Sequence, residues 1–143
     1  MNRKLTLVVL ATILSGCAIK QQVDQVALAP DAMLCIVENK EVREGFLPEL
    51  QKALHEKGIK HSVVDSSYAQ NHCEWTMTYV ARWSWDMTIY MSYAEINVFR
   101  NGVPDGRAVY DSTGGSFNFS KFIDAEPKIH ELVDQLIQSS SVT

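Results

Sequence analysis

The 143-residue sequence lacks the short motifs that mark most enzyme classes. It has no Gly-x-Ser-x-Gly elbow and no Cys-x-x-Cys pair, and its Gly-rich stretch Asp111–Gly115 has neither the spacing nor the lysine of a phosphate-binding loop. Its N-terminal apolar run, Leu5–Leu14, is too short to cross about 30 Å of hydrocarbon. These absences argue against a serine hydrolase, a P-loop enzyme and a membrane-spanning N-terminal helix.

Positive charge is also scarce. The chain has 13 Lys and Arg against 17 Asp and Glu, a net charge of −4. Two of the basic residues, Arg3 and Lys4, fall in a predicted cleaved segment, so 11 basic residues would remain against 17 acidic ones, a net charge of −6. An acidic domain repels the phosphates of nucleic acid, and we therefore expect no nucleic-acid partner.

The first 17 residues have the pattern of a secretory signal. A basic head and the apolar run are followed by Leu14-Ser15-Gly16-Cys17, which resembles the lipobox of bacterial lipoproteins. The resemblance implies removal of residues 1–16 and lipidation of Cys17, which would anchor the chain to a membrane. Because Ala18 follows in place of Asp, it implies the outer membrane, with the domain facing the periplasm. The alternative is an ordinary secreted protein in which Cys17 has no special role.

With Cys17 lipidated, two cysteines remain in an oxidising compartment, Cys35 and Cys73. The sequence predicts a disulfide between them, which would stabilise the fold by about 4 kcal/mol by closing a long loop in the unfolded chain. Two free thiols in the core are the alternative.

Composition divides the chain into four parts. Residues 1–16 are the predicted signal peptide, and residues 17–31, rich in Gln, are the predicted lipidated cysteine and tether, which would reach roughly 45 to 50 Å when extended. Residues 32–138 are expected to form one periplasmic α+β domain, and residues 139–143 a frayed tail.

Alternating apolar and polar residues organise the centre of that domain. Residues 74–113 predict three long antiparallel strands, with a β-bulge near Tyr93 and a turn over Asn101–Gly106. Residues 32–37 and 59–64 predict two more strands, joined in a parallel crossover by a helix over 41–57, and residues 65–72 predict a polar loop. A second helix is expected near Ile129–Ile137. The order β-α-β-β-β-β-α predicts a mostly antiparallel five-stranded sheet with both helices on one face.

Candidate catalytic and metal-binding groups are few. Asp86, Glu95 and Asp111 are the candidate acids of a hydrolase acting on cell-wall or glycan material, but they fall at a turn or on the polar faces of strands. The nearest set of metal-ligating residue types is His61, Asp65, His72 and Cys73, whose spacing does not match a zinc site. We therefore expect no enzyme, no metal and no cofactor.

Six aromatic residues fall within 19 positions of the predicted strands: Trp75, Tyr79, Trp83, Trp85, Tyr90 and Tyr93. Cross-strand packing in the core is the first interpretation, and a binding surface for a glycan, a peptide or an envelope protein is the alternative. The candidate binding surface lies at the predicted hairpin tip and comprises Arg82, Trp83, Trp85 and Asp86.

The string Tyr79–Met87, with Tyr90, Met91, the lipobox and the cysteine pair, resembles a family of small proteobacterial lipoproteins first described in Shewanella, to which no function is assigned. The resemblance implies periplasmic exposure and a bond between Cys35 and Cys73, and it supplies no catalytic residue. We expect a non-enzymatic binding or scaffolding module, with the membrane as one partner through the lipid and an envelope protein or peptidoglycan as another. A hydrolase and a carrier of a small ligand are the alternatives.

Overall fold

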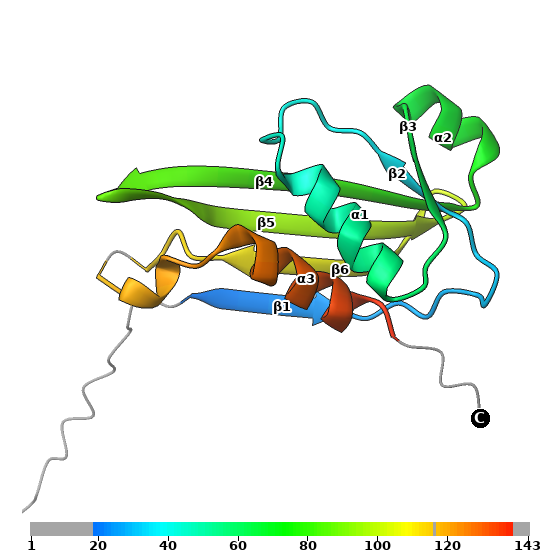
Figure 1. The fold of residues 1–143 in the computed structure, drawn as a ribbon. Helices are drawn as coiled ribbons and strands as arrows, with labels where there is room; N and C mark the ends of the chain where they lie inside the picture. The colour runs from blue at the N-terminus through cyan, green and yellow to red at the C-terminus, as the bar shows by residue number, and fades with distance from the viewer. Residues whose placement is uncertain (1–18, 116, 139–143) are drawn as a thin grey trace, which may run out of the picture.

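The computed structural model describes residues 19–115 and 117–138, so the predicted signal peptide, Cys17 and the C-terminal tail lie outside the described residues. One mixed sheet forms the body, in the order β1-β6-β5-β4-β2-β3 (Figure 1). The strands are β1 (Lys20–Asp24), β2 (Leu34–Val37), β3 (His61–Val64), β4 (Trp75–Asp86), β5 (Thr88–Arg100) and β6 (Val103–Asp111). The helices are α1 (Phe46–Glu56), α2 (Ser66–His72) and α3 (Ala125–Leu136), with a short 3-10 turn η1 (Phe119–Lys121). The α+β class is confirmed, whereas the predicted five strands and two helices are too few.

The three long strands β4, β5 and β6 form the predicted antiparallel meander. Between Arg82 and Trp83 the pairing shifts from Tyr93 to Met91, which leaves Ser92 as the extra residue of a bulge. The bulge predicted near Tyr93 is therefore confirmed. The next turn is shorter than predicted: Asn101 and Gly102 both have positive φ (49° and 76°), a two-residue hairpin turn, and β6 begins directly after it.

The predicted parallel crossover is also present. Strand β2 pairs in parallel with β3 on one side and with β4 on the other, and α1 connects β2 to β3. Helix α1 has Gly45 as its N-cap and Pro48 in its first turn, where the missing N–H of proline is not needed. Gly58, with φ of 72°, follows the helix in the left-handed conformation that ends many helices.

The predicted tether is wrong for residues 20–24, which form the edge strand β1. It pairs antiparallel with β6, from Lys20 opposite Asp111 to Asp24 opposite Arg107. The amide of Gln21 donates to side chains of α3, Glu131 and Gln135, at 2.9 Å each. The ladder with β6 and the hydrogen bonds to α3 hold this strand, and Val23 is its one apolar residue packed against the core, which is too little for a hydrophobic pattern to reveal.

The predicted polar loop over 65–72 is wrong as well, because these residues form α2. The carboxylate of Asp65 caps the helix by accepting a hydrogen bond from the backbone N–H of Tyr68 at 2.8 Å. Only Ala69 of this helix is buried, so it carries no apolar stripe that a periodicity argument could detect. Cys73 follows α2 and forms a disulfide with Cys35 of β2, which confirms the predicted pair.

Helices α1 and α3 lie side by side on one face of the sheet, as predicted for the two helices (Figure 1). The core between them and the strands is closed by fully buried side chains, among them Phe46, Leu50 and Leu54 of α1, Ile129, Leu132 and Leu136 of α3, and Ile36, Met77, Met91, Ile96 and Tyr110 of the sheet. Within residues 19–115 and 117–138, no helix combines the length and apolar character needed to span a membrane.

Candidate binding sites

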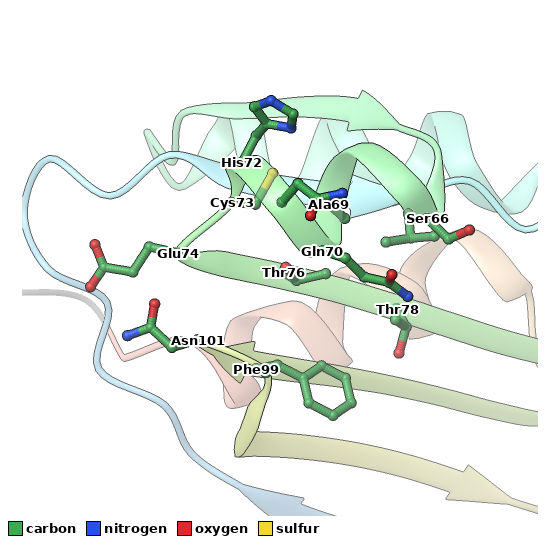
Figure 2. Close-up of a pocket in the computed structure, with 13 residues that line it drawn as sticks. Ser66, Ala69, Gln70, His72, Cys73, Glu74, Thr76, Thr78, Phe99 and Asn101 are labelled. Atoms are coloured by element: carbon green, nitrogen blue, oxygen red, sulfur yellow. The ribbon is translucent and has the colours of Figure 1, made fainter.

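An open groove of about 860 Å³ lies between α2 and the ends of β4 and β5 (Figure 2). Thr76 and Thr78 form its floor on β4, where they alternate with the core residues Trp75 and Met77. The groove therefore occupies the face of the sheet opposite α1 and α3. In Figure 2 the two threonines lie between Gln70 of α2 and the ring of Phe99 on β5.

The groove offers hydrogen-bonding groups that the rest of the described chain does not use. The side chains of Gln70, Thr76, Thr78 and Asn101 line it, and none of them makes a side-chain hydrogen bond to another described residue. The half-buried Phe99 adds one aromatic ring beside these uncharged groups. His72 and the carboxylate of Glu74 also line the groove, and Glu74 is paired with Arg100 at 3.1 Å. Polar groups around an aromatic ring suit a polar and partly flat ligand, such as a sugar ring or a peptide segment.

The disulfide holds one wall of this groove. Cys73 lines the groove at the C-terminal end of α2, and its partner Cys35 lies on β2, with the two Cα atoms 6.2 Å apart. Helix α2 buries little apolar surface of its own, so the covalent bond is its main attachment to the sheet. The sequence reasoning missed the groove because it did not predict α2, although it placed both threonines on the polar side of a strand.

The structure brings three of the four residues of the predicted binding surface together, because Arg82, Trp83 and Trp85 line one open hollow of about 650 Å³. Asp86 does not line this hollow. The guanidinium of Arg82 lies 4.4 Å from the ring centroid of Tyr93, and Asp86 forms an ion pair with Lys121 at 2.6 Å. Trp83 packs edge-on against the buried Phe46. Only Trp85 presents its ring to solvent, with 75% of its surface exposed.

Half of the aromatic cluster is buried and Trp83 is partly buried against the core, which supports the first interpretation. Trp75, Tyr79 and Tyr90 are buried, and Tyr79 stacks on Phe46 with ring centroids 5.2 Å apart. The Tyr79 hydroxyl accepts a hydrogen bond from the backbone N–H of Asn39 at 3.0 Å. A Trp83→Ala change would therefore damage the fold, and Trp85 is the aromatic residue suited to test a surface role.

Exposed apolar side chains lie on the hairpin that joins β4 and β5 and on the segment around η1, which contacts the hairpin through Lys121 and Phe122. We call this surface the apolar tip, and it comprises Trp85, Met87, Ile89, Phe117 and Phe119. Trp85 and Ile89 are opposite each other in the hairpin. Of these residues the sequence analysis singled out Trp85 alone, because Phe117 and Phe119 lie 32 and 34 residues further along the chain, in a segment for which it predicted no structure.

A polar network occupies the open face of the central strands. The carboxylate of Glu95 accepts two hydrogen bonds of 3.1 Å from Arg107, one of 2.9 Å from the amide of Asn97, and one from the hydroxyl of Tyr93. The bonds from Arg107, with those from Tyr93 and Asn97, lower the pKa of Glu95 from 4.5 to about 2 in spite of partial burial, which raises it.

The three candidate acids of the hydrolase hypothesis do not share one pocket. Glu95 is bound by Arg107, Asp111 bonds to Thr113, and Asp86 lies at the hairpin paired with Lys121. Hydrogen bonds from Thr113 lower the pKa of Asp111. Since Glu95 and Asp111 are both held ionised, neither is suited to donate a proton to a leaving group near neutral pH.

The candidate metal ligands are not gathered either. His61 contacts the backbone carbonyl of Ile59, and His72 stacks on Tyr68 with ring centroids 4.4 Å apart. Across residues 19–115 and 117–138, no three His, Cys, Asp or Glu side chains come together in a way that could hold a metal ion. Between α1 and α3, His130 bridges the carboxylates of Glu49 and Glu56 at 2.9 and 3.2 Å.

Comparison with known proteins gives a likeness in fold alone. No family model and no curated protein matches the sequence. Solved structures that match the fold include a PelC dodecamer from Paraburkholderia phytofirmans and a dodecamer of a point variant of the same protein, at 13% and 12% identity. Each has a TM-score of 0.58 and covers 83% of this chain and 98% of the PelC chain. The matched region spans nearly the whole PelC chain, so the two proteins share a complete domain architecture.

Proposed function

We propose that the protein is an outer-membrane-anchored periplasmic lipoprotein whose domain is a non-enzymatic binding module of the cell envelope. The observation that carries the proposal is the groove beside α2, in which the uncharged side chains of Gln70, Thr76, Thr78 and Asn101 have no side-chain partner and lie near the ring of Phe99. We propose that this groove holds a neutral stretch of an envelope glycan such as peptidoglycan. Ring stacking and hydrogen bonds to hydroxyl and acetamido groups would supply the affinity.

The membrane and compartment parts of the proposal draw on two further observations. The lipobox ending at Cys17 supports attachment through an N-terminal lipid, as in the lipoprotein family that the sequence resembles. The Cys35–Cys73 disulfide supports an oxidising compartment, because cytosolic thiols are kept reduced.

Binding is favoured over hydrolysis because two of the three candidate acids are held ionised by their hydrogen-bond partners. Glu95 and Asp111 have lowered pKa values and already hold partners, which suits a structural role on the sheet. An enclosed carrier is less well supported than an open binder, because core side chains fill the layer between the sheet and α1 and α3, whereas the groove is open to solvent.

Calorimetric titration of the full-length protein with the N-acetylglucosamine tetramer tests the proposed ligand class. We expect the affinity to fall about tenfold in Phe99→Ala, which removes the stacking ring, and severalfold in Thr78→Val, which removes one hydroxyl at nearly constant volume. Trp85→Ser, at the other end of β4, is the control and should bind as the wild type does. Absence of binding at millimolar sugar, or equal affinity in Phe99→Ala, would refute the glycan proposal.

A second candidate function is scaffolding by self-assembly. The two fold neighbours are dodecamers, and the sheet of this chain has β1 and β3 as edge strands, whose outer hydrogen-bonding groups are open to a second strand. Light scattering on the purified protein tests this candidate, because an assembly of the 16.1 kDa chain would have a mass that is a multiple of the chain's mass. A particle of one chain's mass at tens of micromolar would rule it out.

A further inference from the structure

The apolar tip is the most exposed apolar surface of the described chain. Trp85, Met87, Phe117 and Phe119 are exposed to 75%, 83%, 94% and 80%, the four highest values among the large hydrophobic residues of 19–115 and 117–138. Ile89 adds a further 56%. Scattered exposed apolar residues are normal, but a group of this kind marks a surface that contacts something apolar.

The residues of the tip come from two segments that are joined at the hairpin. The β4–β5 hairpin is joined to the η1 segment by the ion pair of Asp86 with Lys121, at 2.6 Å, and by the ring of Phe122, which packs edge-on against Tyr90 at 5.2 Å. Lys121 is itself buried. This connection holds the η1 segment, in which Phe119 contacts Phe122 with ring centroids 6.4 Å apart, against the face of the hairpin that carries Asp86 and Tyr90. Trp85 and Ile89 lie on the opposite face of the same hairpin, so the exposed apolar side chains surround its end.

The chain enters the domain at the same end. A Cβ atom added to Gly115 would lie 3.5 Å from the side chain of Ile19 and 3.7 Å from Asn118, so Ile19 adjoins the segment that carries Phe117 and Phe119. Strand β1 starts at Lys20, at the end of the sheet where the hairpin also lies (Figure 1). Cys17 is three residues before Lys20, a distance of about 10 Å at most.

The backbone at the tip adds an independent indication. Met87 forms the single-residue link between β4 and β5 and has φ of 62°. Glycine adopts this conformation freely, whereas it is strained for a long side chain. A methionine with 83% of its surface in solvent gains nothing from packing there, so the position is better explained by a role for the side chain outside the domain.

We infer that this end of the domain docks on the lipid bilayer, with the apolar tip inserted at the level of the headgroups. The inference rests on the proposed anchor at Cys17, which would hold the start of β1 within about 10 Å of the membrane surface. A long tether would let any surface face the bilayer. The short connection to β1 instead selects the end that carries Trp85 and the exposed phenylalanines, and an aromatic group of this kind is typical of the membrane interface.

Tryptophan quenching in membranes tests the docking. The lipidated full-length protein is reconstituted in phosphatidylcholine vesicles whose lipids carry bromine high on the acyl chain. Of the three tryptophans, Trp75 is buried and Trp83 half-buried, so quenching by lipid should come from Trp85 and disappear in Trp85→Phe. Met87→Gly, which relieves the strained φ and should fold well, is expected to lower the ratio of docked to undocked protein about tenfold. Val103→Ser, an exposed apolar position in the β5–β6 turn region, is the control and should be quenched like the wild type.

The possible results distinguish a failure of the docking inference from a failure of the proposed lipid anchor. Mass spectrometry first establishes whether Cys17 carries fatty acid. A lipidated protein in which Trp85 is not quenched would overturn the docking and leave the proposed lipoprotein intact, whereas a chain without fatty acid would overturn both. A blue shift of Trp85 emission that depends on protein concentration without lipid would assign the tip to contact with a second copy, and would also overturn the inference.

Discussion

Replacing Glu95 by Gln should remove a large, pH-dependent part of the stability of the domain. Each pKa unit corresponds to about 1.4 kcal/mol, so lowering the pKa from 4.5 to about 2 sets an upper limit of about 3.4 kcal/mol. The Arg107 side chain is 47% exposed, and solvent screening reduces the expected contribution to about 2 kcal/mol. We therefore expect Glu95→Gln to lower the free energy of unfolding by about 2 kcal/mol at pH 7.

The pH profile identifies the cause. Because the folded pKa is lowered, the contribution is complete above about pH 5 and is lost as pH falls toward 2. Urea unfolding at several pH values should show the wild type and Glu95→Gln converging over that range. Glu74→Gln is a matched control, since Glu74 also pairs with an arginine at 3.1 Å but both side chains are more than half exposed, and it should change stability by less than about 1 kcal/mol. Curves that stay parallel from pH 7 to pH 2 would contradict the reasoning.

Three other changes test the fold. Replacing Cys35 and Cys73 together by Ser should lower the free energy of unfolding by about 4 kcal/mol and raise the urea dependence, because the unfolded chain loses its cross-link; an unchanged midpoint in urea would contradict this. Gly106→Ala should lower the free energy of unfolding by about 1–3 kcal/mol, because the new Cβ would lie 2.7 Å from Cβ of Val26. A melting temperature equal to that of the wild type would show that Val26 and the preceding strand β1 can move away. Met87→Gly should leave stability unchanged or raise it by up to about 1 kcal/mol, and a clear loss in a thermal melt would mean that the methionine packs on the domain.

The sequence predicted those elements whose apolar residues are buried in a regular pattern. The meander followed from alternation along residues 74–113, the bulge from the change of phase at Tyr93, and both large helices from their apolar stripes. The cysteine pair followed from counting and compartment. In each case the prediction rested on residues that the fold buries or joins covalently. Buried residues recur along the sequence with the period of the helix or strand that carries them.

The elements that the sequence did not predict are fixed by polar contacts. Strand β1 is held through Gln21 and its ladder with β6, and α2 through its Asp65 cap and the disulfide of Cys73. Each packs a single apolar residue against the domain, Val23 in β1 and Ala69 in α2, so neither can be found from periodicity. The groove and the apolar tip depend on these two elements and on the η1 segment, which is why the candidate sites were less predictable than the core.

The length of β4 links the two candidate surfaces. The strand carries the groove residue Thr76 near its first residue and Trp85 next to its last, and nine steps of about 3.3 Å separate them. A tip lying at the bilayer would place the groove roughly 30 Å into the periplasm, at a height set by a rigid strand rather than by a flexible linker. Such a strand acts as a spacer, and any polymer bound in the groove would be kept at a fixed clearance above the lipid.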